Sequence, residues 1–99
     1  MSSAPTRTVL VTGAARRLGR EIALGLAAWG WQVAVHFRGS ADDATKTIAD
    51  CAALTRAAAG FQADLGLEDE ARALVPRVVA HFGQLDAVVN SASLFEHDD

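Results

Sequence analysis

Two glycines bracket a short basic segment near the start of the sequence, in the run Thr12-Gly13-Ala14-Ala15-Arg16-Arg17-Leu18-Gly19. Gly13 allows a tight turn that a side chain would obstruct, and Gly19 would let a following helix lie close to a sheet. Backbone N–H groups at the start of such a helix favour an anion. We therefore expect a pyrophosphate-binding loop, with an ordinary strand-to-helix turn as the alternative. Arg16 is interpreted either as part of this site or as a solvated charge at its mouth.

The stretch Val35-His36-Phe37-Arg38-Gly39-Ser40 lies about 20 residues after the glycines, where NAD-binding domains carry an acid for the ribose 2′-hydroxyl. This stretch contains no acid and offers Arg38, Ser40 and the backbone around Gly39 instead. A 2′-phosphate would be attracted to these donors. The sequence therefore predicts NADPH rather than NADH. His36 is interpreted as a cofactor contact or as a packed residue at a strand end.

Two more polar groups follow expected strands. Asp64 and Leu65 come after a short apolar run, and Asp64 also suits the first turn of a helix. The last group is Asn90-Ser91-Ala92-Ser93-Leu94-Phe95. If the strands are parallel, these loops share one edge of the sheet with the glycine loop.

The elements that would position these loops are predicted from hydrophobic periodicity. Strands are expected at Thr8–Thr12, Gln32–His36, Phe61–Ala63 and Leu85–Asn90. The first helix carries the stripe Leu18, Ile22, Leu26 and Trp29 and ends at Gly30. The second is expected over Asp42–Ala59, ending at Gly60, and the third over Leu67–Phe82, bent or interrupted at Pro76 and ending at Gly83.

This β-α-β-α-β-α-β alternation predicts an α/β fold, a Rossmann-type doubly wound parallel sheet with strand order 3-2-1-4. Strands 1 and 4 would be neighbours, and a crevice would open at their carboxyl ends. We expect residues 1–7 to form a flexible tail and residues 8–99 to form part of one domain.

Composition excludes several classes of protein. The 99 residues are 51% apolar, which is too high for a disordered chain. The net charge of −3 lacks the positive excess that is typical of nucleic-acid-binding domains. A single Cys excludes a fold held together by internal disulfides. The sequence has no apolar run of membrane-spanning length and no metal-ligand spacing. We therefore expect a cytoplasmic protein that binds no nucleic acid, membrane or metal.

The glycine loop resembles the Thr-Gly-x-x-x-Gly-x-Gly signature of the short-chain dehydrogenases/reductases, with Arg17 in place of the middle Gly. This departure is similar to the pteridine reductases, whose loop reads Thr-Gly-Ala-Ala-Lys/Arg-Arg-Leu/Ile-Gly. The resemblance implies that Arg17 lies near the cofactor phosphates and the edge of a bound pterin. The planar guanidinium of an arginine presents several N–H donors, which suits both a phosphate and the edge of a flat heterocycle.

Other segments carry the same resemblance. The pteridine reductases have a similar His-Tyr-x-Arg-Ser stretch; here Phe37 replaces the Tyr and Arg38 sits one place earlier. The resemblance implies that Asp64 accepts a hydrogen bond from the adenine, and that Asn90 and Ala92 back the ribose and nicotinamide. The family's Asn-Asn-Ala-Ser-x-Phe places a serine hydroxyl at Ser93 and a pterin-stacking ring at Phe95, while Ser91 departs from the second Asn.

The expected site residues come from all four loops and fall into two groups. Cofactor-binding residues are Gly13, Arg16, Arg17, Leu18, Gly19, His36, Phe37, Arg38, Ser40, Asp64, Leu65, Asn90, Ser91 and Ala92, and substrate-binding residues are Arg17, Ser93 and Phe95.

The catalytic Tyr-x-x-x-Lys pair of the family has no counterpart, because the sequence contains no Tyr and its only Lys is Lys46. We expect the cofactor-binding half of a longer enzyme, inactive alone, whose parent transfers hydride from NADPH to a pterin or dihydrofolate. A ketone, sugar or 3-oxoacyl reductase is one alternative, and a non-catalytic nucleotide-binding fragment is another. The resemblance also implies a homotetrameric or homodimeric parent.

Overall fold

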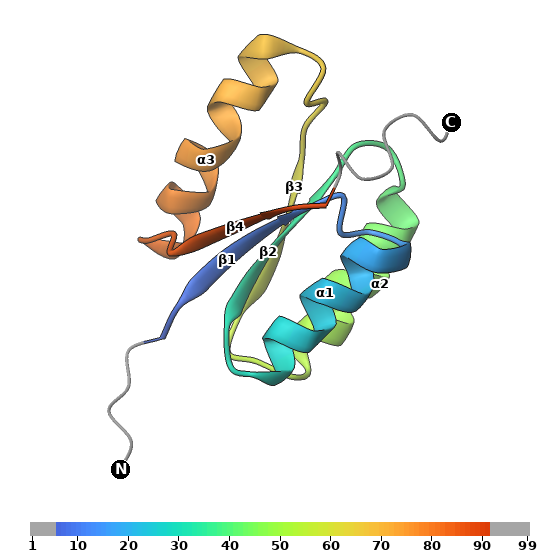
Figure 1. Ribbon diagram of the computed structural model, residues 1–99, viewed down its shortest axis with the longest axis vertical. Coiled ribbons are helices and arrows are strands. Elements are labelled where there is room, and N and C mark those ends of the chain that lie inside the picture. The colour runs from blue at the N-terminus through green and yellow to red at the C-terminus, as the bar shows by residue number, and fades with distance from the viewer. Residues whose placement is uncertain (1–5, 92–99) are drawn as a thin grey trace.

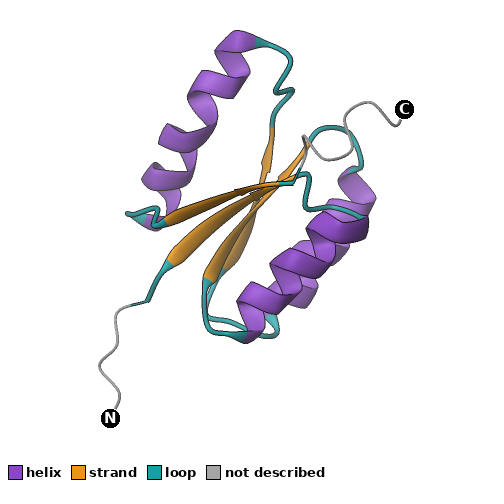
Figure 2. Ribbon diagram, viewed as in Figure 1, coloured by secondary structure: helices purple, strands orange, loops and turns teal. Residues whose placement is uncertain are grey.

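A parallel sheet forms the centre of the computed structural model, which describes residues 6–91 (Figures 1 and 2). Its strands are β1 (Thr8–Thr12), β2 (Gln32–Phe37), β3 (Ala58–Gln62) and β4 (Ala87–Asn90). The helices between them are α1 (Arg17–Ala28), α2 (Ala41–Ala52) and α3 (Glu68–Phe82). The strand order β3-β2-β1-β4 confirms the predicted topology.

Strand β1 lies inside the sheet and is buried along its whole length. It pairs with β2 on one side and β4 on the other, and Val11 lies opposite both Val35 and Val89. Because successive side chains of a strand point to opposite faces, β1 supplies two cores. Val9 and Val11 pack with α1 and α2, whereas Leu10 packs with Leu74 and Val78 of α3. Figure 1 shows α1 and α2 on one face and α3 on the other.

The predicted second helix is too long. Helix α2 ends at Ala52, and residues 58–62 form β3 beside β2. The segment is alanine-rich and suits a helix by propensity, but pairing with β2 decides its conformation. Gly60 therefore does not end a helix. A Cβ on Gly60 would lie 2.5 Å from Cδ1 of Ile48, so this glycine lets α2 pack closely on β3.

Of the bend or interruption predicted at Pro76, the interruption is wrong, because α3 continues through this residue. A proline removes one backbone hydrogen bond from a helix interior. Pro76 lies on the exposed side, while Leu74 and Val78 are buried on the opposite side. Packing of these two residues against the sheet stabilises the helix at this position. Gly83 ends the helix in the left-handed conformation, with φ of 85°, as expected.

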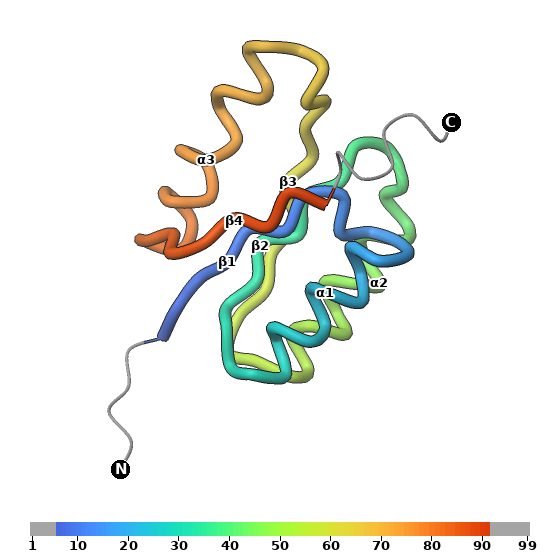
Figure 3. Tube along the Cα trace, viewed as in Figure 1, coloured from blue at the N-terminus to red at the C-terminus, as the bar shows by residue number. Residues whose placement is uncertain are grey.

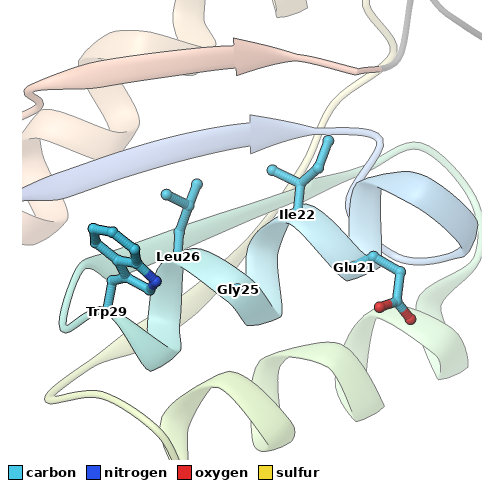
Figure 4. A pocket seen from close by; sticks show the side chains of 5 residues that line it. All are labelled: Glu21, Ile22, Gly25, Leu26 and Trp29. Carbon is cyan, nitrogen blue, oxygen red and sulfur yellow. The ribbon is translucent and has the colours of Figure 1, made fainter.

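The residues of helix α1 that face the sheet are small. Gly19, Ala23 and Ala27 are buried, whereas Trp29 of the predicted apolar stripe is 86% exposed. Ile22 and Leu26 are partly buried at the margin of the core. Together with Glu21, Gly25 and Trp29 they line an open, mostly apolar pocket on this helix (Figure 4). In the part of the chain that is described, no helix is long and apolar enough to cross a membrane.

Candidate functional site

The predicted polar loops meet at the carboxyl edge of the sheet. Since every strand pair is parallel, the chain leaves all strands at this edge (Figure 3). After β1 the chain enters α1 on one face, whereas α3 lies on the other face and leads into β4. Between β1 and β4 the winding therefore reverses, which is the place where open α/β sheets bind ligands.

Both glycines of the β1–α1 loop are required by the geometry. Gly13 has φ of 65°, in the left-handed region that favours glycine. A Cβ on Gly19 would lie 2.0 Å from the carbonyl oxygen of Gly13 and 2.8 Å from Oγ of Ser91. The predicted tight turn and close approach are both confirmed. The start of α1 therefore lies directly against the end of β1, with its first N–H groups lacking intrahelical partners by helix geometry.

Arg17 is the non-glycine residue with a positive φ, 58°, among residues 6–91. It occupies the position where the sequence signature has its middle Gly, so the loop keeps the glycine-like backbone and adds a cation. The left-handed conformation costs an ordinary residue about 1–2 kcal/mol. Arg16, Arg17 and Leu18 are all exposed, and Arg16 forms a 3.6 Å ion pair with Asp43 of α2.

His36 at the end of β2 joins three segments of the site. Its Nδ1 accepts a hydrogen bond from the N–H of Gly13 at 2.9 Å, and its Nε2 donates to the carbonyl of Ala63 at 2.9 Å. These partners fix the neutral tautomer with the proton on Nε2, because an N–H only donates and a carbonyl only accepts. Burial lowers the pKa of His36, which is 2% exposed, and the nearby Arg77 lowers it further. The structure thus has His36 packed at the strand end, with both ring nitrogens bonded within the protein.

The loop after β2 presents donors to the crevice. The side chain of Arg38 is 74% exposed, and its Nε lies 3.9 Å from Oδ2 of Asp64. Ser40 precedes the first turn of α2, where its carbonyl accepts from the N–H of Ala44 at 2.8 Å. Phe37 is half-buried, with its ring beside Gly60 of β3.

Asp64 forms hydrogen bonds within its own segment of the chain. Its Oδ1 accepts from the N–H of Gly66 at 2.9 Å, and its own N–H donates to Oε1 of Glu70 at 2.7 Å. These contacts shape the β3–α3 loop beside the place expected for the adenine. Leu65 packs at the margin of the core on the α3 face.

The end of β4 closes the crevice beside β1. Oγ1 of Thr12 donates to Oδ1 of Asn90 at 3.0 Å, and the buried hydroxyl of Ser91 donates to the carbonyl of Thr12. Ser91 therefore holds the two strand ends together under the glycine loop. Ala92, Ser93 and Phe95 lie outside the described residues.

Thr47 is a supporting residue that the sequence analysis missed. Its buried hydroxyl donates to the carbonyl of Ala15 at 2.9 Å and accepts from Nη1 of Arg20 at 3.0 Å, and Arg20 also pairs with Asp50. The contact braces the glycine loop from α2. Thr47 stands three residues after Ala44 and four before Cys51, on the buried face of α2, and this helical spacing was the available signal.

Cysteine and metal chemistry find no support in the described residues. Burial raises the pKa of the Cys51 thiol to about 11, so it stays protonated at neutral pH. Over residues 6–91, no three His, Cys, Asp or Glu side chains are grouped as metal ligands would be.

The fold and this site define a dinucleotide-binding domain of the doubly wound α/β class. Residues 7–99 match the family model described as short chain dehydrogenase, and the chain belongs to this family.

Named relatives agree at the family level. The chain is 40% identical over 89 residues to a Staphylococcus aureus 3-oxoacyl-[acyl-carrier-protein] reductase FabG, covering 90% of this chain and 36% of that protein. It is 39% identical over 88 residues to the hydroxynaphthalene reductase arp2 of Aspergillus fumigatus, covering 89% of this chain and 32% of that protein. It thus spans about a third of the length of these relatives. Neither is a pteridine reductase, so the resemblance is confirmed for the family and not for that subfamily.

Solved structures give the same result. A Burkholderia cenocepacia structure described as a dehydrogenase with bound NADP superposes with a TM-score of 0.82 at 35% identity, covering 86% of this chain and 33% of that one. The acetoin dehydrogenase of Enterobacter cloacae superposes with a TM-score of 0.83 at 30% identity, covering 89% of this chain and 35% of that one.

Proposed function

We propose that residues 8–99 are the NADPH-binding part of a short-chain reductase, preceded by a short tail at residues 1–7. The observation that carries this proposal is the close approach of Gly19 to the carbonyl of Gly13, because it packs the start of α1 against the end of β1 and brings the first N–H groups of the helix to the crevice, where a pyrophosphate would bind. Backbone N–H groups at the start of α1 would hold the pyrophosphate, and Arg16 and Arg17 would add positive charge. The bound nicotinamide would supply a hydride.

Arg38 and Ser40 would bind the 2′-phosphate of NADPH. The ion pair between Arg38 and Asp64 is long and exposed, so it costs little to exchange for a phosphate. Asp64 would then accept from the adenine amino group, with Leu65 beside it. Asn90 and Ala92 would support the ribose and nicotinamide, and Phe37 would line the adenosine side. The family neighbour with bound NADP supports this choice of cofactor.

The cofactor proposal is tested by titrating the chain with NADPH and NADH. The double variant Arg38→Glu/Ser40→Ala is expected to raise the Kd for NADPH about 10- to 100-fold, since hydrogen bonds to charged groups contribute about 1.5–3 kcal/mol. The Kd for NADH should change less than about threefold. Arg56→Glu is the matched control, because Arg56 is exposed and bonds to Thr6 at the opposite edge of the sheet. Equal losses for both cofactors would contradict the assignment.

For the parent enzyme we propose a pterin or dihydrofolate substrate. The support is Arg17, an exposed cation of the glycine loop whose left-handed backbone keeps the loop shape of the family signature. Ser93 and Phe95 would complete the substrate site, with the Phe95 ring stacked on the flat heterocycle. In the parent, Phe95→Ala should raise the apparent KM for a pterin strongly while leaving NADPH binding unchanged.

A second candidate is reduction of a carbonyl, as in a 3-oxoacyl substrate. The name of the Staphylococcus aureus relative favours it. Steady-state rates of the parent with a dihydropterin and with a 3-oxoacyl thioester would decide between the two.

The proposal also places the catalytic Tyr outside this chain, which contains none. NADPH oxidation by the 99 residues alone would contradict it. A cytoplasmic location and a homodimeric or homotetrameric parent belong to the same proposal.

A further inference from the structure

His36 makes three hydrogen bonds that tie the glycine loop to the rest of the crevice. Its ring Nδ1 accepts from the N–H of Gly13, and its carbonyl accepts from the N–H of Ala14, each at 2.9 Å. Its ring Nε2 donates to Ala63, at the end of β3. The two residues of the loop that are nearest to β1 are thus fixed by one residue of β2.

The bond to Gly13 matters most, because Gly13 has the left-handed backbone that turns the chain toward α1. Its carbonyl oxygen is the atom that faces Gly19 across the narrowest approach of the loop. A change in the backbone angles of Gly13 would therefore move the start of α1 and its N–H groups. The N–H of Gly13 belongs to the Thr12–Gly13 peptide and points at the imidazole, whereas its carbonyl belongs to the Gly13–Ala14 peptide, whose N–H bonds to the carbonyl of His36. His36 therefore holds the peptides on both sides of Gly13.

We propose that His36 is a positioning residue for cofactor binding, and that its neutral imidazole holds the Thr12–Gly13 peptide, and with it the turn at Gly13, in the orientation that a pyrophosphate requires. The inference rests on the proposed NADPH site, since it assigns a supporting role to a residue beneath that site. His36 touches no cofactor atom in this scheme and acts through Gly13.

Protonation would remove this support. A second ring proton on Nδ1 would face the N–H of Gly13, so the hydrogen bond would be replaced by repulsion between two donors. The charged groups around the ring are few. Arg77 of α3 opposes protonation and donates to the carbonyl of Gln62 at 2.8 Å, next to Ala63. Asp64 follows Ala63 and faces Arg38, while Arg16 and Arg17 of the glycine loop are exposed. The ring is therefore neutral at pH 7, and acid is needed to charge it.

Two variants separate the hydrogen bond from the packing. In His36→Asn, the amide oxygen stands near the position of Nδ1 and accepts from Gly13 without titrating. In His36→Leu, the bulk remains and the acceptor is lost, which leaves a buried N–H without a partner. His81→Gln is the control, because it removes an exposed imidazole that packs on Phe61 and Phe82.

The first measurement is the Kd for NADPH at pH 7.5. We expect a change of less than about threefold in His36→Asn and a rise of about tenfold or more in His36→Leu, as loss of a buried bond implies. Between pH 7.5 and 4.5, the Kd should rise more steeply for the native chain and for His81→Gln than for His36→Asn. The 2′-phosphate also titrates, near pH 6, but equally for every variant. Equal binding by His36→Leu and His36→Asn, or equal pH profiles for the native chain and His36→Asn, would overturn the proposal.

The second measurement needs no cofactor. In ¹⁵N-resolved NMR spectra, the amide of Gly13 should shift in step with titration of the His36 ring, and this shift should vanish in His36→Asn. If the chemical shift of the Gly13 amide does not change as the His36 ring titrates, the positioning role is overturned. If Gly13 follows the ring but no variant binds NADPH, then the proposed function fails while the hydrogen-bonded anchor stands.

Discussion

Gly19→Ala should destabilise the chain strongly, although alanine is the better helix former. The added Cβ would lie 2.0 Å from the carbonyl oxygen of Gly13, whereas real Cβ atoms do not come within 3.0 Å of such neighbours. Relief therefore requires a backbone shift of about 1 Å, in a region packed to near-crystalline density. The obstacle is backbone, which cannot rotate away as a side chain can.

The magnitude follows from two opposing effects. Overpacking of this kind costs about 1–3 kcal/mol, and a backbone clash belongs at the upper end. Replacing glycine by alanine in a helix returns about 1 kcal/mol. The net loss in the free energy of unfolding is thus about 2 kcal/mol, a large part of the 5–15 kcal/mol typical of a domain.

Gly25→Ala on the same helix is the matched control. Gly25 is exposed, and a Cβ there would meet no atom within 4 Å, so only the helix propensity acts. It should gain about 0.5–1 kcal/mol. Urea unfolding followed by circular dichroism measures both variants. With an m value of about 1.5 kcal/mol/M, Gly19→Ala should lower the midpoint by about 1 M, and Gly25→Ala should raise it by about 0.5 M. Equal midpoints for the two variants would refute the argument from close approach.

Two further predictions concern the loop and its histidine. Arg17→Gly should raise the free energy of unfolding by about 0.5–1 kcal/mol, because it removes a side chain from a left-handed position, and it should weaken binding of NADPH. Arg16 has an extended φ of −141°, so Arg16→Gly should not raise the free energy of unfolding. If the two variants have equal effects in urea unfolding, the backbone strain inferred at Arg17 is contradicted. Because the pKa of His36 is lower in the folded than in the unfolded chain, its stabilisation should be complete above pH 6.5 and decline as the pH falls below it. Between pH 7.5 and 4.5, the urea midpoint should fall more steeply for the native chain than for His36→Asn. Parallel pH dependences of the two midpoints would contradict this role of His36 in stability.

The topology was predictable because its signals are local and repeated. Short β-branched runs alternate with amphipathic segments, which indicates parallel strands joined by right-handed crossovers, and the doubly wound class supplied the order 3-2-1-4. The tight turn at Gly13 and the close packing of α1 at Gly19 were predictable for a similar reason, since the two glycines stand on either side of a strand-to-helix turn. The boundary of α2 was not, because Ala58 and Ala59 suit a helix and become part of β3 only by pairing with β2.

The face of α1 that meets the sheet could not be chosen from hydrophobicity. The apolar stripe favoured Leu18 and Trp29, but close packing against β1 and β2 selects small side chains such as Ala23 and Ala27. The double hydrogen bonding of His36 and Thr47 was equally hidden, because the partners come from distant segments: two backbone groups for His36, and a backbone carbonyl and the Arg20 side chain for Thr47. A sequence shows which residues can donate or accept, but not which peptide will face them.

The position of β1 inside the sheet has a consequence for the time course of folding. Its partners arrive in order, first β2 and then β4, and the N–H of Thr8 bonds to Asp86 across a separation of 78 residues. Contacts of such long range close slowly, because the intervening chain must first be ordered. Ser91 reaches the carbonyl of Thr12 across 79 residues. On a ribosome, the glycine loop would therefore be synthesised early and would acquire its final shape only after β4 had emerged.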